Sequence, residues 1–271
     1  MMRALWTAST GMKAQQTNVD TIANNISNVN TVGYKTQQTE FKSLLYQTLA
    51  TETTSANGEQ KPTSAQVGLG TRVASTSSIF SQGPRNATEN MTDFALEGSG
   101  FFAVQNGTET MYTRAGSFAW GINGAGTVSL TTSEGYYVLN QGGQQITLPA
   151  GVAADSVSVA SDGMFSYRNA AGEIVPLNMS FGLFQFNNPA GLEKVSNSLM
   201  RVTPASGQPI AEANNAALKQ TEVYQGYLEG SNVSVADEMV NLIVAQRAYE
   251  LNSKAITTSD EMLGQANDLK R

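Results

Sequence analysis

Carboxylates are the side chains of this sequence that come closest to a catalytic set. The 271 residues include no histidine and no cysteine, which excludes Ser–His and Cys–His nucleophile pairs and the commonest zinc ligands. Asp93 and Glu97 lie close together in the sequence, and a glycoside hydrolase could use such a pair of acids. The 22 acidic residues are, however, spread over the whole chain without grouping. We therefore predict that the protein is not an enzyme and has no catalytic residue, no metal site and no cofactor.

The glycine pair in Gly98-Ser99-Gly100 is a second candidate for chemistry, as a phosphate-binding loop. Such a loop needs the N-terminus of a helix directly behind its glycines. The residues that follow, from Phe101 to Val104, instead form a short apolar run that is typical of a strand. We expect a tight turn between two strands here.

Charge and composition exclude two classes of partner. The formal net charge is −6 and no basic run appears, so we predict no nucleic-acid binding. The sequence has no stretch of about 20 apolar residues, so we predict no membrane span. Charged residues make up only 14 % of the chain, against roughly 25 % in an average domain. A surface so poor in charge favours a chain that packs against neighbours.

Apolar residues recur every seven positions near both ends of the chain. A seven-residue repeat places an apolar seam along a helix, and such seams pack against other helices. The N-terminal rows are Leu5, Met12, Val19 and Ile26, with Ala8, Gln15, Ile22 and Val29 between them. The C-terminal rows are Val235, Leu242, Tyr249, Ile256 and Leu263, with Ala245 and Ala266 in a companion row. We predict that these seams mediate self-association.

Pairing of the two terminal helices with each other alone is the simpler alternative, because helical apolar stripes usually face the protein's own core. Further apolar residues nevertheless flank the C-terminal seam, namely Met239, Val240, Ile243 and Met262. Two helices bury too little surface to cover both the seams and these flanks, which favours contact with another chain.

The pattern predicts an α+β fold, in which long N- and C-terminal helices form a coiled-coil-type core and accompany a central all-β domain. Helices are predicted from residue 2 to about 30 and from residue 235 to about 268. Short apolar runs separated by turns predict the β domain over 93–203. A short amphipathic turn of helix is also predicted; its apolar residues are Phe41, Leu44, Leu45 and Leu49.

These elements predict four parts of the chain. The terminal helical domain comprises 1–35 plus 230–271, a connecting segment covers 36–92, and a return connection covers 204–229 after the β domain. Residues 46–73 are too polar to form a core and too many for an ordinary connection. We interpret them as an extended arm that staples subunits together, anchored by Tyr46, Leu49, Val67 and Leu69.

Several motifs resemble those of the flagellar rod and hook proteins. Residues 23–35 closely resemble the signature of this family, and its matching positions include Asn24, Asn25, Asn28, Gly33, Tyr34 and Lys35. The runs 225–233 and 238–263 are similar to the C-terminal motifs of the family, and the second run contains Gln246 and Arg247. Residues 98–102 and 112–118 match its central part, so the resemblance extends from end to end.

The resemblance implies a structural subunit of the bacterial flagellar basal body. In its length and in the run Asn252-Ser253-Lys254-Ala255, the chain most resembles the distal-rod branch of the family. The hook and proximal-rod branches remain alternatives. A distal-rod subunit would polymerise into a rigid helical drive shaft that crosses the periplasm and transmits torque to the hook. A β-rich polysaccharide-binding surface protein or enzyme is the alternative from another class.

The resemblance also implies partners and a route of export. The partners would be other copies of the chain, proximal-rod proteins, hook and junction proteins, and the bushing-ring proteins around the rod. Export would use the flagellum's own type III apparatus, without a cleaved signal peptide. The start of the chain, which lacks the apolar core and the cleavage site of a secretory signal, agrees with that expectation.

Overall fold

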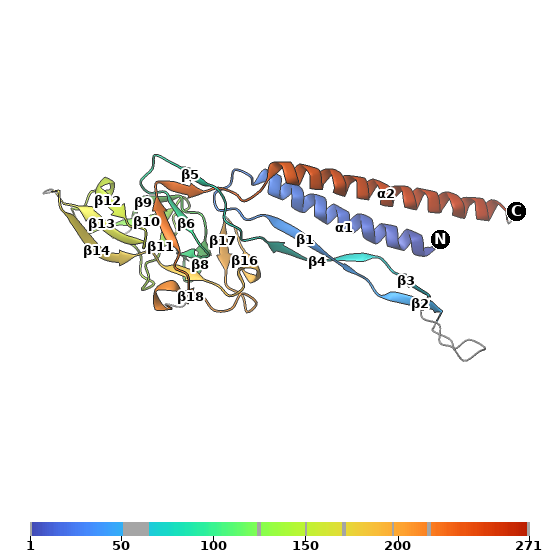
Figure 1. Ribbon diagram of the computed structural model, residues 1–271, viewed down its shortest axis with the longest axis horizontal. Coiled ribbons are helices and arrows are strands. Elements are labelled where there is room, and N and C mark those ends of the chain that lie inside the picture. The colour runs from blue at the N-terminus through green and yellow to red at the C-terminus, as the bar shows by residue number, and fades with distance from the viewer. Residues whose placement is uncertain are drawn as a thin grey trace. The chain divides into compact units, whose positions relative to one another are not determined.

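The computed structural model describes residues 2–50, 65–123, 126–149, 151–169, 172–196, 198–215 and 218–269. Two long helices, α1 (Met2–Ser27) and α2 (Val235–Asp268), flank a strand-rich region in the sequence, so the fold is α+β as predicted (Figure 1). The chain divides into two compact units. The helical unit comprises Met1–Ser27, Gln37–Ser77 and Ser234–Arg271, and the β unit comprises Asn28–Thr36 and Ser78–Val233.

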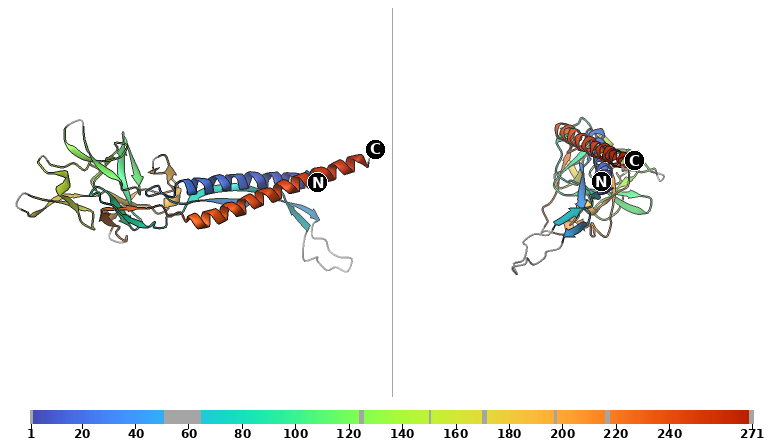
Figure 2. Two further views of the ribbon diagram at one scale, coloured as in Figure 1. Left: turned by 90° about the horizontal axis from the view of Figure 1, so that it is seen from above. Right: turned by 90° about the vertical axis from the view of Figure 1, so that its right-hand side faces the viewer.

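In the helical unit, α1 and α2 lie antiparallel and side by side (Figure 1, Figure 2). A two-stranded ribbon belongs to the same unit. In it β1 (Gln37–Ser43) pairs with β4 (Thr71–Ser78), and β2 (Tyr46–Ala50) pairs antiparallel with β3 (Ala65–Gly68). Backbone hydrogen bonds from Leu44 N to Gly70 O (2.8 Å) and from Leu69 N to Leu45 O (3.2 Å) join the two strand pairs into one ribbon.

The short helical turn predicted near residue 45 is wrong, since the chain there forms β1 and β2. The residues concerned are Phe41, Leu44, Leu45 and Leu49. Along β1, Thr39 is buried while Gln38 and Glu40 are exposed, which is the alternation of a strand that rests one face on a neighbour. That neighbour is α1, where Thr21 Oγ1 accepts a hydrogen bond of 2.9 Å from Thr39 Oγ1. Pairing with β4 and packing on α1 therefore outweigh the helical spacing of four apolar residues.

Both long helices are confirmed, although the first is shorter than predicted. α1 ends at Ser27 and not near residue 30, because a turn follows in which Thr31 N donates to Asn28 O at 3.2 Å. Val29 lies past the end of the helix, so it is not part of the seam. α2 starts after Ser234, whose Oγ accepts a hydrogen bond of 3.5 Å from Asp237 N. This is the N-cap arrangement that satisfies a free N–H at the start of a helix.

The largest sheet of the β unit has nine strands among the described residues. Seven of them follow the order β16-β17-β8-β7-β11-β10-β9, and β15 pairs with both β7 and β18. The bounds are β7 (Phe101–Asn106), β8 (Glu109–Thr113), β9 (Phe118–Ile122), β10 (Val128–Thr132), β11 (Tyr137–Val138), β15 (Leu183–Gln185), β16 (Glu193–Lys194), β17 (Leu199–Arg201) and β18 (Ile210–Ala211). Asn106-Gly107 marks the hairpin between β7 and β8, as predicted.

Three smaller groups of strands complete the β unit. β12 (Val157–Val159), β13 (Met164–Arg168) and β14 (Ile174–Ser180) form an antiparallel sheet. β19 (Glu222–Gln225) pairs with β6 (Phe94–Glu97), and β20 (Tyr227–Glu229) pairs with β5 (Arg85–Ala87). Short 3-10 turns lie at Ala154–Ser156, Pro189–Gly191 and Glu212–Asn214. Residues 204–229, predicted as a return connection, thus contribute β18, β19 and β20.

Aromatic side chains form the centre of the β unit. Phe94, Phe102, Phe118, Phe165 and Phe181 are all buried, and neighbouring rings in this cluster lie 4.8 to 6.3 Å apart. Contacts between tilted or edge-on rings at such distances add to the stabilisation that burial gives. The cluster draws on strands from all along residues 94–181, so it holds the β unit together over long sequence distances.

Candidate self-association surface

The predicted apolar rows lie on two helices that pack along each other, and their burial is uneven. On α1, Ile22 is buried, whereas the first row is only half-buried; its members are Leu5, Met12, Val19 and Ile26. On α2, Leu242, Ile256 and Leu263 are half-buried. Val235 and Tyr249 remain 41 % and 43 % exposed. The single helical unit therefore covers its seams only in part.

The companion row of α2 is more polar than predicted. Apolar Ala245 was expected there with Ala266, but Ala266 is exposed. The other covered members of this row are Glu238 and Ser259, which are buried, and Asn252, which is half-buried. A search for apolar repeats misses them, although their seven-residue spacing is visible in the sequence.

Polar side chains of α1 also face inward. Gln15 lies in the companion row of α1, and its Oε1 is buried with no hydrogen-bond partner among the described residues. Gly11 lies against the amide of Asn252, close enough that a Cβ on Gly11 would come within 2.9 Å of Asn252 Nδ2. Contact between α1 and α2 therefore depends on small and polar residues as much as on apolar ones.

A second apolar stripe runs along α2, which we call the outer stripe. It consists of Val240, Val244, Leu251 and Met262 on α2 and of Leu269, the C-cap residue directly after the helix; they are 59 %, 62 %, 66 %, 45 % and 88 % exposed. At about 100° per residue these five positions fall within an arc of about 40°, on the side of the helix opposite the row from Val235 to Leu263. Exposed apolar stripes of this size mark interaction sites.

Asn25, a residue of the family signature, fastens β1 to α1. Its Nδ2 donates to Gln37 O (2.8 Å), and its Oδ1 accepts from Gln37 N (2.9 Å). Asn25 Nδ2 also donates to Glu238 Oε2 of α2 at 3.3 Å. The side chain is buried, so one amide connects both helices and the ribbon. Its neighbour Asn24 is exposed.

Lys35, another signature residue, belongs to a buried ion cluster in the β unit that the sequence did not reveal. Lys35 Nζ lies 2.7 Å from Glu229 Oε1, and Arg114 Nη2 lies 3.0 Å from Glu229 Oε2. All three side chains are at most 4 % exposed. Burial lowers the pKa of Lys35 and of Arg114, and the carboxylate of Glu229 opposes both shifts. One buried anion thus serves two buried cations.

Backbone groups complete the cluster. Arg114 Nη1 donates to Gly98 O (2.8 Å) and Gly100 O (2.6 Å), and Lys35 Nζ donates to Ser81 O (2.7 Å). These bonds give Gly98-Ser99-Gly100 a structural role as a turn between β6 and β7, as expected. The ion cluster ties together segments that lie far apart in the sequence.

The remaining residues of the family motifs lie in both units. Gly33 has φ +68°, which favours glycine, and a Cβ there would lie 2.7 Å from Ala115 N. Asn28 Oδ1 accepts from Thr31 Oγ1 (3.0 Å), and the Tyr34 ring lies 5.1 Å from Lys194 Nζ. In the helical unit, Gln246 and Arg247 are exposed on α2; Arg247 Nη1 donates to Glu250 Oε2 at 3.0 Å.

The predicted arm is partly covered by the described residues. Tyr46 and Leu49 on β2 are 61 % and 55 % exposed, while Val67 and Leu69 across the ribbon are half-buried. The centre of the arm, residues 51–64, lies outside the described residues. Both ends of the arm thus form a paired ribbon with apolar groups open to a partner.

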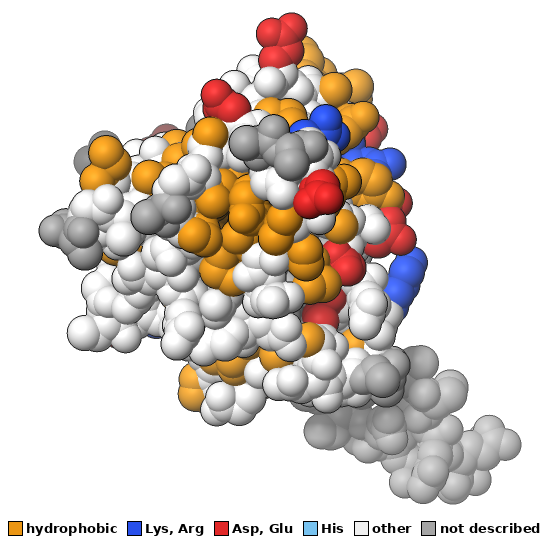
Figure 3. Space-filling model, turned by 90° about the vertical axis from the view of Figure 1, so that its left-hand side faces the viewer, with side chains coloured by type: hydrophobic (Ala, Val, Ile, Leu, Met, Phe, Trp, Pro, Cys, Tyr) orange, Lys and Arg blue, Asp and Glu red, His pale blue; other side chains and the backbone are white. Residues whose placement is uncertain are grey.

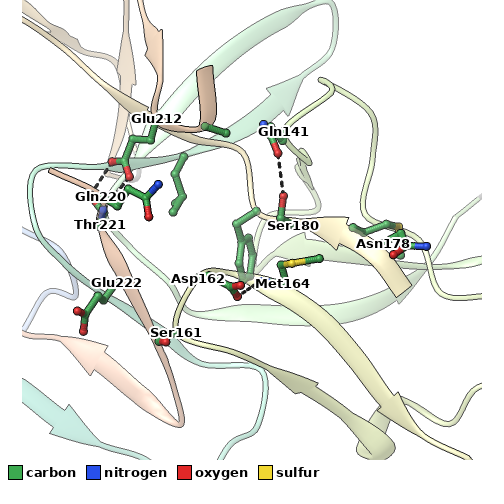
Figure 4. A pocket seen from close by; sticks show the side chains of 14 residues that line it. Gln141, Ser161, Asp162, Met164, Asn178, Ser180, Glu212, Gln220, Thr221 and Glu222 are labelled. Carbon is green, nitrogen blue, oxygen red and sulfur yellow. Dashed lines mark hydrogen bonds between the residues drawn. The ribbon is translucent and has the colours of Figure 1, made fainter. Parts of the chain in front are cut away.

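The acids first considered for catalysis have structural partners. Glu97 Oε2 accepts from Arg85 Nη1 at 2.6 Å, and Asp93 Oδ2 accepts from Asn90 Nδ2 at 3.4 Å. A polar cavity of about 640 Å³ lies elsewhere in the β unit (Figure 4). Its most buried acid, Glu212, accepts hydrogen bonds from Thr221 N (2.7 Å), Thr221 Oγ1 (2.6 Å) and Gln185 Nε2 (2.9 Å). These carboxylates stabilise strands and turns.

The outer surface also argues for a packed environment. Figure 3 shows one face on which hydrophobic side chains gather among uncharged polar ones, with few charged groups. Exposed apolar residues of the β unit include Met91, Ile122 and Ile174, at 54 %, 80 % and 66 % exposure. None of the described helices is long and apolar enough to cross a membrane.

Three flagellar families match successive parts of the chain. Residues 5–35 match the flagella basal body rod protein family, residues 95–167 match the D1 domain of the flagellar hook protein FlgE/F/G, and residues 224–269 match the C-terminal part of the flagellar basal body rod FlgEFG protein. Flagellar basal-body rod proteins FlgG are similar over the full length of both chains, at 46 % identity in Borreliella burgdorferi and 39 % in Bacillus subtilis. This chain belongs to the flagellar basal-body rod protein family.

Membership decides between the alternatives that the sequence left open. The family is one of structural flagellar rod proteins and not of enzymes. A flagellar hook-basal body complex protein FlhP of Bacillus subtilis is also similar, but at only 30 % identity over the same full coverage, so the rod protein FlgG is the better match. A polysaccharide-binding protein or enzyme is not favoured.

The buried ion cluster of this rod protein joins the three segments that match flagellar families. Lys35 falls in the first match, Arg114 in the second and Glu229 in the third. Each segment thus contributes one charged side chain to the same place, and the signature position Lys35 has its partner 194 residues further along the chain.

Proposed function

We propose that this chain is a subunit of the distal rod of the bacterial flagellum, where it polymerises into a rigid helical shaft that transmits torque to the hook. The outer stripe of α2 is the observation that supports self-association most strongly. Full burial of a Val, Leu or Met side chain contributes about 1.5–3 kcal/mol, so covering five of them would supply a large part of the affinity between subunits.

The helices supply the polymer core in this proposal. Residues 1–35 plus 230–271 form the core domain, and α1 and α2 of neighbouring copies pack in the manner of a coiled coil. The half-buried rows from Leu5 to Ile26 and from Val235 to Leu263 become fully covered on assembly. Contact between unlike surfaces repeats without closing, which generates a helical filament.

The proposed setting is the flagellar basal body, with the rod crossing the periplasm. Partners are further copies of the chain, proximal-rod proteins, hook and junction proteins and the bushing-ring proteins. Export through the flagellar type III apparatus, without a cleaved signal peptide, would deliver the chain to the growing end of the rod.

A charge on the outer stripe tests the proposal. Val244→Asp would bury an unpaired carboxylate between subunits, which costs several kcal/mol, so filaments should fail to form. Thr257→Asp is the matched control, because Thr257 is exposed on α2 but lies off both apolar stripes. Sedimentation and electron microscopy of the full chain provide the measurement. Normal filaments from Val244→Asp would contradict a role of the outer stripe in assembly.

A further inference from the structure

The contact between α1 and α2 includes two places where a polar side chain of α2 lies directly opposite one particular residue of α1. Asn25 of α1 lies opposite Glu238 of α2, with 3.3 Å between Nδ2 and Oε2. Gly11 of α1 lies opposite Asn252 of α2, with its Cα facing the Asn252 amide. Gly11 precedes Asn25 by two heptads, and Asn252 follows Glu238 by two heptads. Both contacts therefore belong to one antiparallel register.

Apolar rows alone do not specify that register. The same seven-residue spacing runs through both helices, so a displacement by one heptad again places apolar residues against apolar residues. Such a displaced pairing is open to helices of neighbouring copies in a filament as well as to the two helices of one chain. Polar residues at seam positions remove this degeneracy, because each tolerates only certain opposite residues.

Each of the two polar contacts disfavours one direction of displacement. If α2 moved by one heptad so that Asn252 faced Ala4, a Cβ would stand where Gly11 now leaves space for the amide. Gly11 is the only glycine in α1, so no other position offers this space. If α2 moved the opposite way, Asn252 would face Asn18, and Glu238 would lie beyond Ser27, where α1 has ended.

Asn25 is oriented for its contact with Glu238 by hydrogen bonds to residues outside α2. Two hydrogen bonds to the backbone of Gln37 fix its amide plane, so the Nδ2 group that meets Glu238 has a set direction. Glu238 is itself buried, and a displaced helix would leave its carboxylate without this donor, which is costly for a buried charge.

We propose that Gly11–Asn252 and Asn25–Glu238 are positioning pairs that select a single register of α1 against α2. The register determines at which height the outer stripe stands along the helical unit, and hence where a neighbouring copy can pack. That consequence for assembly rests on the proposed function, whereas the register itself does not.

A cysteine pair can report the register, since the natural chain has no cysteine. Asn18 and Ala245 lie midway between the two polar contacts, one heptad from each, so Asn18→Cys with Ala245→Cys should form a disulfide within one chain on mild oxidation. Mass spectrometry of the digested full chain distinguishes this bond from one between chains. Yield is measured in pelleted filaments and, where none form, in the soluble chain.

Substitutions are then compared in this reporter chain. Gly11→Ala should lower the yield of the intrachain disulfide several-fold, although alanine is the better helix former. Adding Asn252→Ala should restore the yield, because it removes the amide that meets the new Cβ. Gly264→Ala is the matched control: Gly264 is likewise a glycine within a helix, here α2, a Cβ there meets nothing within 4 Å, and the yield should stay unchanged.

Three results would overturn the proposal. They are an absent disulfide in the reporter chain, an unchanged yield with Gly11→Ala, and a loss that Asn252→Ala does not repair. Filament formation is scored separately by sedimentation. A reporter chain that shows the intrachain disulfide but forms no filaments would contradict the proposed function and leave the register assignment standing.

Discussion

The three buried charged residues of the ion cluster interact with one another although they lie far apart in the sequence. Lys35 and Glu229 form a pair of 2.7 Å with at most 1 % exposure of either side chain, and Arg114 shares the same carboxylate. The sequence alone identified Lys35 as a signature residue through its resemblance to the family. No local pattern indicates its partners, because all three contacts span more than 70 residues.

Removal of the shared anion should be the most damaging change in this cluster. Glu229→Gln leaves two buried cations without a counter-ion, and we expect it to lower the free energy of unfolding of the β unit by about 3–5 kcal/mol. Glu97→Gln, which breaks an exposed pair with Arg85, is the control, with an expected loss of about 0–1 kcal/mol. Denaturant titrations followed by near-ultraviolet circular dichroism measure both. Equal losses would contradict the importance of burial.

Lys35→Met should cost less than Glu229→Gln. Its removal leaves one buried cation facing one buried anion, and methionine fills much of the space of the lysine stem. Ser81 O loses the donor Lys35 Nζ but keeps Asn232 Nδ2 at 3.3 Å. The lost hydrogen bond, which involves a charged group, accounts for about 1.5–3 kcal/mol. The same titrations should therefore rank Glu229→Gln as the more destabilising. The reverse order would mean that Lys35 contributes mainly through its hydrogen bonds.

At the scale of elements, the sequence correctly predicted the helices that carry a seven-residue repeat. It did not predict the pairing of strands that lie far apart in the sequence. The seven-residue rows correctly indicated α1 and α2, because helical periodicity is a local property. The residues from Phe41 to Leu49 have helical spacing too, yet they form strands because β4 and β3 supply partners for their backbone. The row with Glu238 and Asn252 has the same seven-residue spacing, but an apolar repeat does not indicate its polar members.

The seam row itself should be needed for assembly and not for folding of the β unit. Ile256 is half-buried on α2, and Ile256→Asp would place an unpaired charge in the seam at a cost of several kcal/mol. We expect that sedimentation detects no filaments. The β unit, followed by near-ultraviolet circular dichroism, should melt at the same temperature as in the natural chain. Filaments in normal yield would refute the seam's role, and a lowered melting temperature would show coupling between the two units.

At the scale of the whole molecule, we expect the helical unit to be the less stable of the two units in a free subunit. The seam is partly open, and α1 contains many poor helix formers, including Thr10, Gly11, Thr17 and Asn18. We predict that a dilute monomer shows less helical signal in far-ultraviolet circular dichroism than the filament and gains the remainder on assembly. Full helix content in a proven monomer, at the level of the filament, would contradict this.

The arm should set the stiffness of the filament. Tyr46 and Leu49 at its start are largely exposed and could pack on an adjacent subunit, which would oppose bending. Deletion of residues 50–66 should leave filaments that form through the helices but bend more easily. Their persistence length in electron micrographs, compared with that of the full chain, is the measurement. Equal stiffness would mean that the deleted segment serves only as a linker within the arm.

The two units obtain all their residues at different stages of synthesis, because they take them from different parts of the chain. The β unit requires no residue beyond Val233, whereas α1 lies before this unit in the chain and pairs with α2, which lies after it. Contacts between residues so distant in sequence form slowly. A chain released after Val233 would therefore contain every residue that the β unit requires. Its α1 segment, however, would have no α2 against which to pack its apolar row. Synthesis of α2 therefore decides whether the helical unit can form, because only chains that contain both helices can close the helical pair.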